Sequence, residues 1–284
     1  MALYYSTPEE TAYFIDYDWV VVYLFRALTE NYTAGSLPEV INFTLDDVRS
    51  AANKALYDGV IRRSVKNISD IKYVYDSRRD FPRELMQVFP ITWLSSGKGK
   101  YFFRRTLRKN IIDIGALNAP PLEHIIDQSP PFTSNLMGTD EQAVFARVRY
   151  AGLINQMLGF QAHPVQGHHR TSVGYGQVEI DEVQAGISGQ LGVIVPISGK
   201  GGQDKMSWSQ VLNLNTYGHQ CLARYGGIAP PLVGVTVRSL CLWLDKNTDE
   251  IWIVEFTPQQ DIDQIGIVQM RRFKFLYSAS RRIF

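Results

Sequence analysis

Two apolar segments separated by a glycine-containing turn constrain the fold of this chain most strongly. They cover residues 177–187 and 191–198, and both are rich in Val and Ile. Such runs, bounded by glycine, predict two adjacent β-strands. Asp181 lies in the first strand, and Lys200 follows the second. A carboxylate and an ammonium at the ends of paired strands suit metal-assisted phosphodiester cleavage, because the carboxylate binds a divalent cation and the lysine positions the attacking water.

The segments around these strands predict a mixed sheet flanked by helices. Helices are expected over 139–158 and 207–224, and further strands over 232–244 and 250–256. Thr139 is the expected N-cap of the first helix, with Gln142 three residues later. The order helix, strand, strand, helix, strand, strand is typical of an α/β (α+β) fold with a mixed central sheet.

The N-terminal part predicts helices followed by a hairpin. Helices are expected over 9–30, 44–59 and 69–79, and two strands with a glycine-rich turn over 90–105. Thr44 is a plausible N-cap, because Asp47 follows three residues later. Helices followed by a hairpin with a basic tip indicate a winged-helix-like DNA-binding domain, in which the hairpin lies along the phosphates. A small helical domain without a nucleic-acid role is the alternative.

The proline-rich stretch between these parts predicts a linker. Ala119-Pro-Pro121 and Ser129-Pro-Pro131 punctuate residues 111–138. We therefore expect one domain over 1–110, a connector over 111–138 and a second domain over 139–284.

Basic charge is concentrated in one block, although the net charge of the chain is only +1. Residues 60–110 contain 13 Lys or Arg and 4 Asp or Glu, interleaved with aromatic residues. Such a block indicates an anionic partner, most simply a nucleic-acid backbone, whereas the alternative is an ordinary solvated surface. The candidate phosphate contacts are Arg62, Arg63, Lys98, Lys100, Arg104 and Arg105.

Cysteine usage and hydropathy indicate a cytoplasmic protein without a membrane span. Cys221 and Cys241 lie in apolar segments and are expected to be small buried residues. The apolar run over 19–25 is too short to cross a bilayer, and no secretory signal is visible at the N-terminus. We therefore expect a reducing cytoplasm.

Residues 139–256 resemble the PD-(D/E)XK nuclease superfamily, and within it the restriction-type endonucleases. The resemblance rests on Asp140-Glu141-Gln142-Ala143, on Gly176 to Glu182, on Val195 to Lys205 and on Gln210. The most specific part is the run Lys-Gly-Gly-x-Asp-Lys that begins at Lys200. It implies a restriction-endonuclease-like core that requires Mg²⁺ or Mn²⁺.

The resemblance also implies roles for individual residues. Asp181 matches the metal-binding carboxylate, Lys200 the lysine of the motif, Glu141 an additional acidic ligand and Gln210 a supporting helix glutamine. Ser198 departs from the pattern, because the family has an acid or Gln at that position. The metal would then rest on Asp181 and Glu141, on Glu179 or Glu182, on a backbone carbonyl near Ser198 and on phosphate oxygens.

One acidic residue and one histidine-rich segment have structural as well as functional interpretations. Glu255 lies in an apolar strand and is either a satisfied buried acid or a site residue. His163, His168, His169 and Arg170 are expected in a loop that contacts DNA or is merely exposed, because their spacing matches no zinc site.

These observations predict a magnesium-dependent restriction-type endonuclease that hydrolyses duplex DNA. Cutting both strands requires two sites, which favours a homodimer. The alternative is a DNA-binding protein that keeps the nuclease scaffold without its chemistry. A third option is a basic block that binds RNA or a protein.

Overall fold

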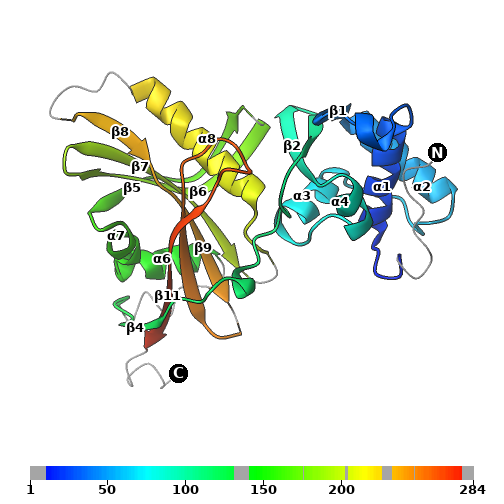
Figure 1. The fold of residues 1–284 in the computed structure, drawn as a ribbon. Coiled ribbons are helices and arrows are strands. Elements are labelled where there is room, and N and C mark those ends of the chain that lie inside the picture. Colours follow the sequence, from blue (N-terminus) through cyan, green and yellow to red (C-terminus); the bar gives the residue numbers. More distant parts are fainter. Residues whose placement is uncertain are drawn as a thin grey trace. The chain divides into compact units, whose positions relative to one another are not determined.

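The computed structural model describes residues 11–130, 141–174, 176–201, 204–225, 232–245 and 247–276. Contacts divide the chain into two units (Figure 1). The first comprises Met1–Ile112 with Gly174–Gln177, and the second comprises Asp113–Val173 with Val178–Phe284. Each unit is described by itself below.

The first unit combines helices with a small antiparallel sheet. Its elements are α1 (Asp16–Thr29), η1 (Ala34–Ser36), β1 (Val40–Thr44), α2 (Leu45–Tyr57), α3 (Ser69–Ser77), α4 (Arg83–Val88), β2 (Ile91–Gly97) and β3 (Lys100–Arg105). The strand order is β1-β3-β2, with both pairs antiparallel. The predicted hairpin is confirmed, whereas β1 and α4 were not foreseen.

The predicted cap of α2 is present. The side-chain hydroxyl of Thr44 accepts a hydrogen bond from the backbone N–H of Asp47 at 3.3 Å. The carboxylate of Asp47 in turn accepts one from the backbone N–H of Thr44 at 2.7 Å. Two otherwise unpaired backbone donors are thereby satisfied, which fixes the point where β1 turns into α2.

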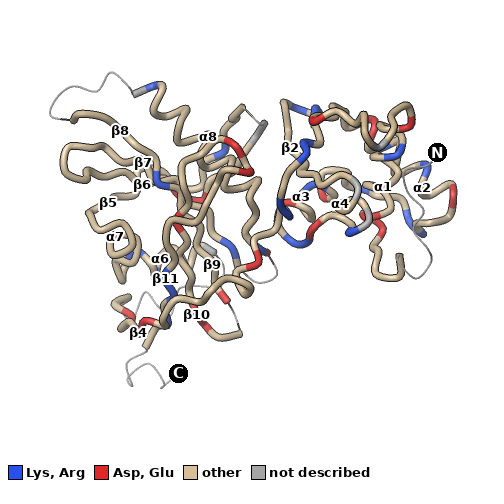
Figure 2. The backbone as a smooth tube through the Cα atoms, in the orientation of Figure 1, with Lys and Arg blue, Asp and Glu red and all other residues tan. Residues whose placement is uncertain are grey.

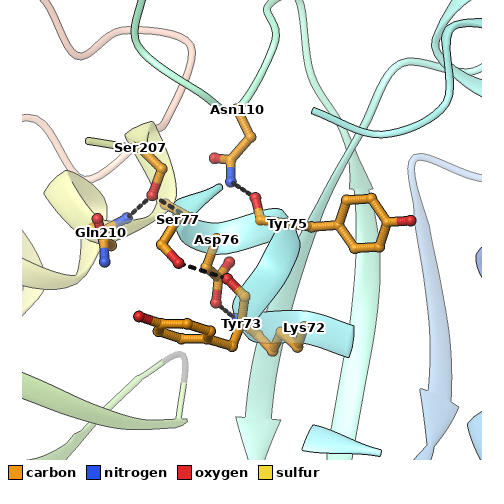
Figure 3. A network of polar contacts seen from close by, with 9 residues as sticks. Lys72, Tyr73, Tyr75, Asp76, Ser77, Asn110, Ser207 and Gln210 are labelled. Atoms are coloured by element: carbon orange, nitrogen blue, oxygen red, sulfur yellow. Dashed lines mark hydrogen bonds and ion pairs between the residues drawn. The ribbon is translucent and has the colours of Figure 1, made fainter. Parts of the chain in front are cut away.

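A buried carboxylate ties α1 to α3. Asp18 is fully buried, and it accepts hydrogen bonds from the Tyr75 hydroxyl at 2.6 Å and the backbone N–H of Ile15 at 2.8 Å. The guanidinium of Arg79 forms an ion pair with it at 2.8 Å. Figure 3 shows that Asn110 donates from its side-chain amide to the Tyr75 carbonyl. These contacts fix α3 within the unit, because a buried charge must be paired.

The second unit is built on a mixed sheet. Its elements are η2 (Ile114–Ala116), β4 (Leu122–Ile126), α6 (Glu141–Tyr150), α7 (Leu153–Leu158), β5 (Ala162–Val173), β6 (Gly176–Ser188), β7 (Leu191–Gly201), α8 (Trp208–Tyr225), β8 (Gly234–Val237), β9 (Ser239–Asp245), β10 (Glu250–Phe256) and β11 (Ile267–Leu276). The strand order is β4-β11-β10-β9-β7-β6-β5, and β8 pairs with β7. A mixed sheet with helices confirms the predicted α+β class.

The two faces of this sheet carry different helices. Val195 and Ile197 of β7 and Leu240 of β9 share an apolar cluster with residues of α6 and α7. Side chains alternate along a strand, so Ser198 and Lys200 of β7 lie on the other face. That face is the one on which α8 packs, as shown by the ring contact between Trp208 and Phe256. We call it the α8 face.

Several predicted boundaries were wrong. The expected loop around His163 and Arg170 is strand β5, and β4 lies inside the expected connector, where it pairs with β11. The helix expected over 139–158 is interrupted at Gly152, whose φ of 63° is left-handed and ends α6. The strand expected over 232–244 is divided at Arg238 into β8 and β9.

Arg238, between β8 and β9, belongs to a buried network through its side chain. Its guanidinium makes two hydrogen bonds of 2.6 Å to the carboxylate of Glu255, which is 3% exposed. Gln269 donates to the same carboxylate at 2.6 Å. Arg238 and Gln269 also donate to the carbonyls of Leu158 and Met157, which lie at the end of α7. Glu255 is thus a satisfied buried acid that anchors α7 to the sheet.

No helix among the described residues is both long and apolar enough to pass through a membrane.

Replacing Arg238 by Leu should destabilise the second unit by about 3–5 kcal/mol, because Glu255 is left charged and unpaired inside the protein. Urea unfolding followed by tryptophan fluorescence measures the loss. Arg271→Leu is the matched control, since Arg271 pairs with the more exposed Glu123 and should cost no more than about 1 kcal/mol. Equal losses in the two variants would contradict this account of the network.

Candidate functional site

The pairing of β6 with β7 brings Asp181 to Ser198. Glu182 pairs with Ile197 in an antiparallel register, and the next step along both strands places Asp181 opposite Ser198. The Oδ2 atom of Asp181 accepts hydrogen bonds from the Ser198 hydroxyl at 3.1 Å and from the backbone N–H of Gly199 at 2.7 Å. The carboxylate is therefore held in one orientation. The sequence did not reveal that Ser198 acts as a donor to Asp181.

Lys200 lies on the same face as Asp181. Ser198 and Lys200 are two residues apart on β7 and therefore point to the same side. Beside Ser198, on the neighbouring strand β9, is its register partner Cys241, which is fully buried. Burial raises the pKa of the Cys241 thiol to about 12, whereas the Lys200 ammonium lowers it and the Asp181 carboxylate raises it further. The register itself places the two charges on one face, because Lys200 is two residues beyond Ser198, which lies opposite Asp181.

The possible metal ligands at this site suit a divalent cation that is bound by a single protein carboxylate. Oδ2 of Asp181 is taken by Ser198 and Gly199, which leaves Oδ1 for an ion. Mg²⁺ often takes only one or two carboxylates and completes its shell with water and substrate phosphates. Among the described residues, no group of three or more His, Cys, Asp and Glu side chains could hold a metal ion. Glu141 begins α6, and its side chain is outside the described part.

Glu179 and Glu182 differ as candidate ligands. Glu179 is on the same face as Asp181, but its carboxylate pairs with His168 at 2.8 Å and with Arg170 at 3.3 Å. Glu182 is fully buried on the opposite face, where it pairs with Arg149 of α6. Glu182 is therefore not available to a metal beside Asp181, because consecutive strand residues point to opposite sides.

Gly199 allows α6 to approach β7 closely. A Cβ atom at this position would lie 2.6 Å from Cε2 of Phe145. Phe145 is 1% exposed and belongs to the cluster between α6 and the sheet. The residue between Ser198 and Lys200 must therefore be small, since its side chain points into a filled core.

Gln210 lies in the first turn of α8, on the face that carries Asp181. Its backbone N–H donates to the Ser207 hydroxyl at 3.3 Å, so Ser207 caps the helix (Figure 3). Its side-chain oxygen is buried and has no hydrogen-bond partner within the described residues. Gln210 thus lies in the helix where it was expected, and no hydrogen bond joins it to Asp181 among the described residues.

The predicted DNA-binding residues fall into two groups. In the first unit, Lys98 lies in the β2–β3 turn and Lys100 begins β3, and both are exposed. Figure 2 shows how Lys and Arg are distributed along the backbone. Arg62 and Arg63 are exposed in the segment between α2 and α3, while Arg104 is half-buried and Arg105 lies over the Phe89 ring.

The second group lies on β5, in the second unit. His168 and Arg170 are exposed and engage Glu179. His169 is half-buried, and its ring contacts Tyr217 of α8 at a centroid distance of 5.5 Å. This contact places His169 on the α8 face, so the histidines belong to an edge strand beside the site and not to a loop.

No family model, no curated protein and no solved structure matched this chain.

Gly199→Ala should destabilise the protein by about 1–3 kcal/mol, because the added methyl group overpacks the contact with Phe145. In a Phe145→Leu background the same substitution should cost less, since the ring no longer occupies that space. Urea unfolding of the two single variants and the double variant measures the coupling between the positions. Strictly additive losses would show that the methyl group and the ring do not meet.

Proposed function

We propose that this protein is a metal-dependent DNA endonuclease of restriction type. The observation that carries the proposal is the placement of Asp181 and Lys200 on one face of the β6–β7 pair. A mixed sheet between α6, α7 and α8 is the scaffold that the sequence resemblance implies. The proposal therefore joins a sequence motif to a register that puts its two charged residues on one face of the sheet.

Each residue at the site has a task in phosphodiester hydrolysis. Asp181, with Glu141 as the second candidate ligand, would hold the ion, and a bound Mg²⁺ would polarise the scissile phosphate and acidify a water. Ser198 and Gly199 keep the Asp181 carboxylate in a fixed orientation, so no reorganisation is needed during the reaction. Lys200 orients the attacking water and offsets the negative charge that develops on the phosphate oxygens.

The first unit supplies a plausible means of holding duplex DNA. Its order α1-β1-α2-α3-α4 followed by a β2–β3 hairpin, with β1 paired to β3, supports a winged-helix-like arrangement. Lys98 and Lys100 at the hairpin tip would contact phosphates, which positions DNA without reading its sequence. Cutting both strands of a duplex would require two copies of the chain, so the proposal includes a homodimer.

One observation favours a second function, that of a DNA-binding protein without cleavage activity. Ser198 occupies the position of an acidic or Gln residue, and its hydroxyl is engaged with Asp181. Both proposals share the DNA partner and differ only in the chemistry.

Asp181→Asn and Lys200→Met should each lower DNA cleavage in Mg²⁺ or Mn²⁺ by at least about 100-fold, because each removes a charge that acts on the reacting phosphate. Cleavage of supercoiled plasmid and of a linear duplex measures the effect. Lys200→Arg, which keeps the positive charge, should retain more activity than Lys200→Met.

Glu39→Gln is the control for loss of a carboxylate, since Glu39 is exposed in the first unit. It should cut as the wild type does. If the wild-type protein retains DNA on a gel but does not cut it in either metal, the endonuclease is refuted and the binding protein is supported.

A Lys98→Glu/Lys100→Glu variant should bind duplex DNA more weakly and show a shallower dependence of affinity on salt. Two lost phosphate contacts should reduce the slope of log K against log [salt] by about 1.8. Arg49→Glu/Lys54→Glu makes the same change of charge on α2, where both residues already pair with Asp46 and Asp58. An equal reduction in this control would mean that net charge, and not the hairpin, determines binding.

A further inference from the structure

A row of aromatic and cationic side chains crosses the sheet beside Lys200. The parallel register pairs Lys200 of β7 with Trp243 of β9. Trp243 pairs with Trp252 of β10, and Trp252 pairs with Arg272 of β11. Since Lys200 is on the α8 face, its directly opposite partners point to that same face. We call these four residues the Trp243 row.

The helix on this face runs away from the row. Trp208, at the start of α8, contacts Phe256, which pairs with Ser239 at the far end of β9 from Trp243. Ten residues later, Gly218 packs against Val237, which pairs with Ile194 of β7. The helix therefore begins on the N-terminal side of the Trp243 row and extends from there toward the N-terminal end of β7.

The row combines two indole rings with two cationic side chains. The rings of Trp243 and Trp252 are 6.2 Å apart, and the guanidinium of Arg272 lies 5.4 Å from the Trp252 centroid. Trp243 and Lys200 are only partly buried. Trp252 is 7% exposed, and its indole N–H has no hydrogen-bond partner within the described residues. A buried donor without a partner is costly, which makes a bound acceptor group at this place favourable.

Charge along the row favours a nucleic-acid strand over a neutral aromatic ligand. Lys200 and Arg272 are three strands apart, or about 14 Å from the strand spacing, and they flank the two tryptophans. The next row on this face pairs Asp245, the last residue of β9, with Glu250, the first residue of β10. The Glu250 carboxylate lies 3.5 Å from Nε of Arg272. Phosphates are attracted to Lys200 and repelled from the acidic row, which favours a path for a bound strand along the Trp243 row.

We propose that Trp243 stacks on an unpaired nucleobase whose phosphate lies at Lys200. Aromatic side chains stack on any base that is free of its partner, and a neighbouring cation binds the backbone. The ligand class is therefore DNA with an unpaired nucleotide next to the phosphate at the site. This proposal rests on the proposed function for the identity of the phosphate site, and it adds a preference for distorted over continuous duplex.

The test uses a labelled DNA duplex with one bulged thymine, and the same duplex with an abasic residue at the bulge. Fluorescence anisotropy without divalent metal measures the affinity of the full-length protein for each. The wild type should bind the thymine bulge about 10–100-fold more tightly than the abasic bulge, which is the range expected for one stacked base.

Variants assign this difference to Trp243. Trp243→Leu should bind both duplexes equally, while Trp243→Phe, which keeps a ring, should retain most of the preference. Trp208→Leu removes a tryptophan from the same face outside the row and should behave as the wild type. Equal binding of the two duplexes by the wild type, or an unchanged preference in Trp243→Leu with a native circular dichroism spectrum, would overturn the proposal.

Binding without metal separates this inference from the endonuclease. If the protein prefers the thymine bulge through Trp243 but cuts no DNA in Mg²⁺ or Mn²⁺, the base-stacking site is supported and the endonuclease is refuted. If the protein cuts DNA but binds the thymine and abasic bulges equally, the endonuclease is supported and the base-stacking site is refuted.

Discussion

The register of β6 on β7 is the constraint on which the candidate site depends. It places Asp181 opposite Ser198 and Glu182 opposite Ile197. Asp181 then binds Ser198 on one face of the sheet, and Glu182 pairs with Arg149 on the other. Slipping the pairing by one residue would bring every β6 side chain to the wrong face. Asp181 would then enter the core under α6, and Glu182 would leave its buried pair with Arg149. The pair that stabilises the core thus also fixes the orientation of the site.

Close packing around β7 and β9 supports this register from the opposite face. The Phe145 ring occupies the space that Gly199 leaves, and Glu255 binds Arg238 and Gln269 at the end of α7. These contacts hold the strand that carries Ser198 and Lys200 between α6 and α8. Lys200 also belongs to the Trp243 row, so its charge lies next to both Asp181's face of the β6–β7 pair and the two tryptophans.

The sequence predicted much of the framework and some of the site. The strand pair around Gly189, the helix that begins after Ser207 and the cap at Thr44 were readable because glycine, apolar runs and capping residues act locally. Asp181 and Lys200 were found from a motif. Ser198 was read as a missing ligand, and its role as a hydrogen-bond donor could not be inferred, because that role depends on the partner strand. Strand β5 was read as a loop, since its polar and histidine-rich pattern is that of an exposed edge.

The sequence by itself determined the α+β class, the concentration of basic residues over 60–110 and the two charged residues of the motif, since these follow from composition and local pattern. Only the tertiary structure decided which carboxylates share a face. Asp181 and Glu182 are neighbours in the chain, but they point to opposite faces of the sheet because side chains alternate along β6. The tertiary structure also decided that Lys200, Trp243, Trp252 and Arg272 form one row. These residues are up to 72 positions apart, and only the register of four strands brings them together.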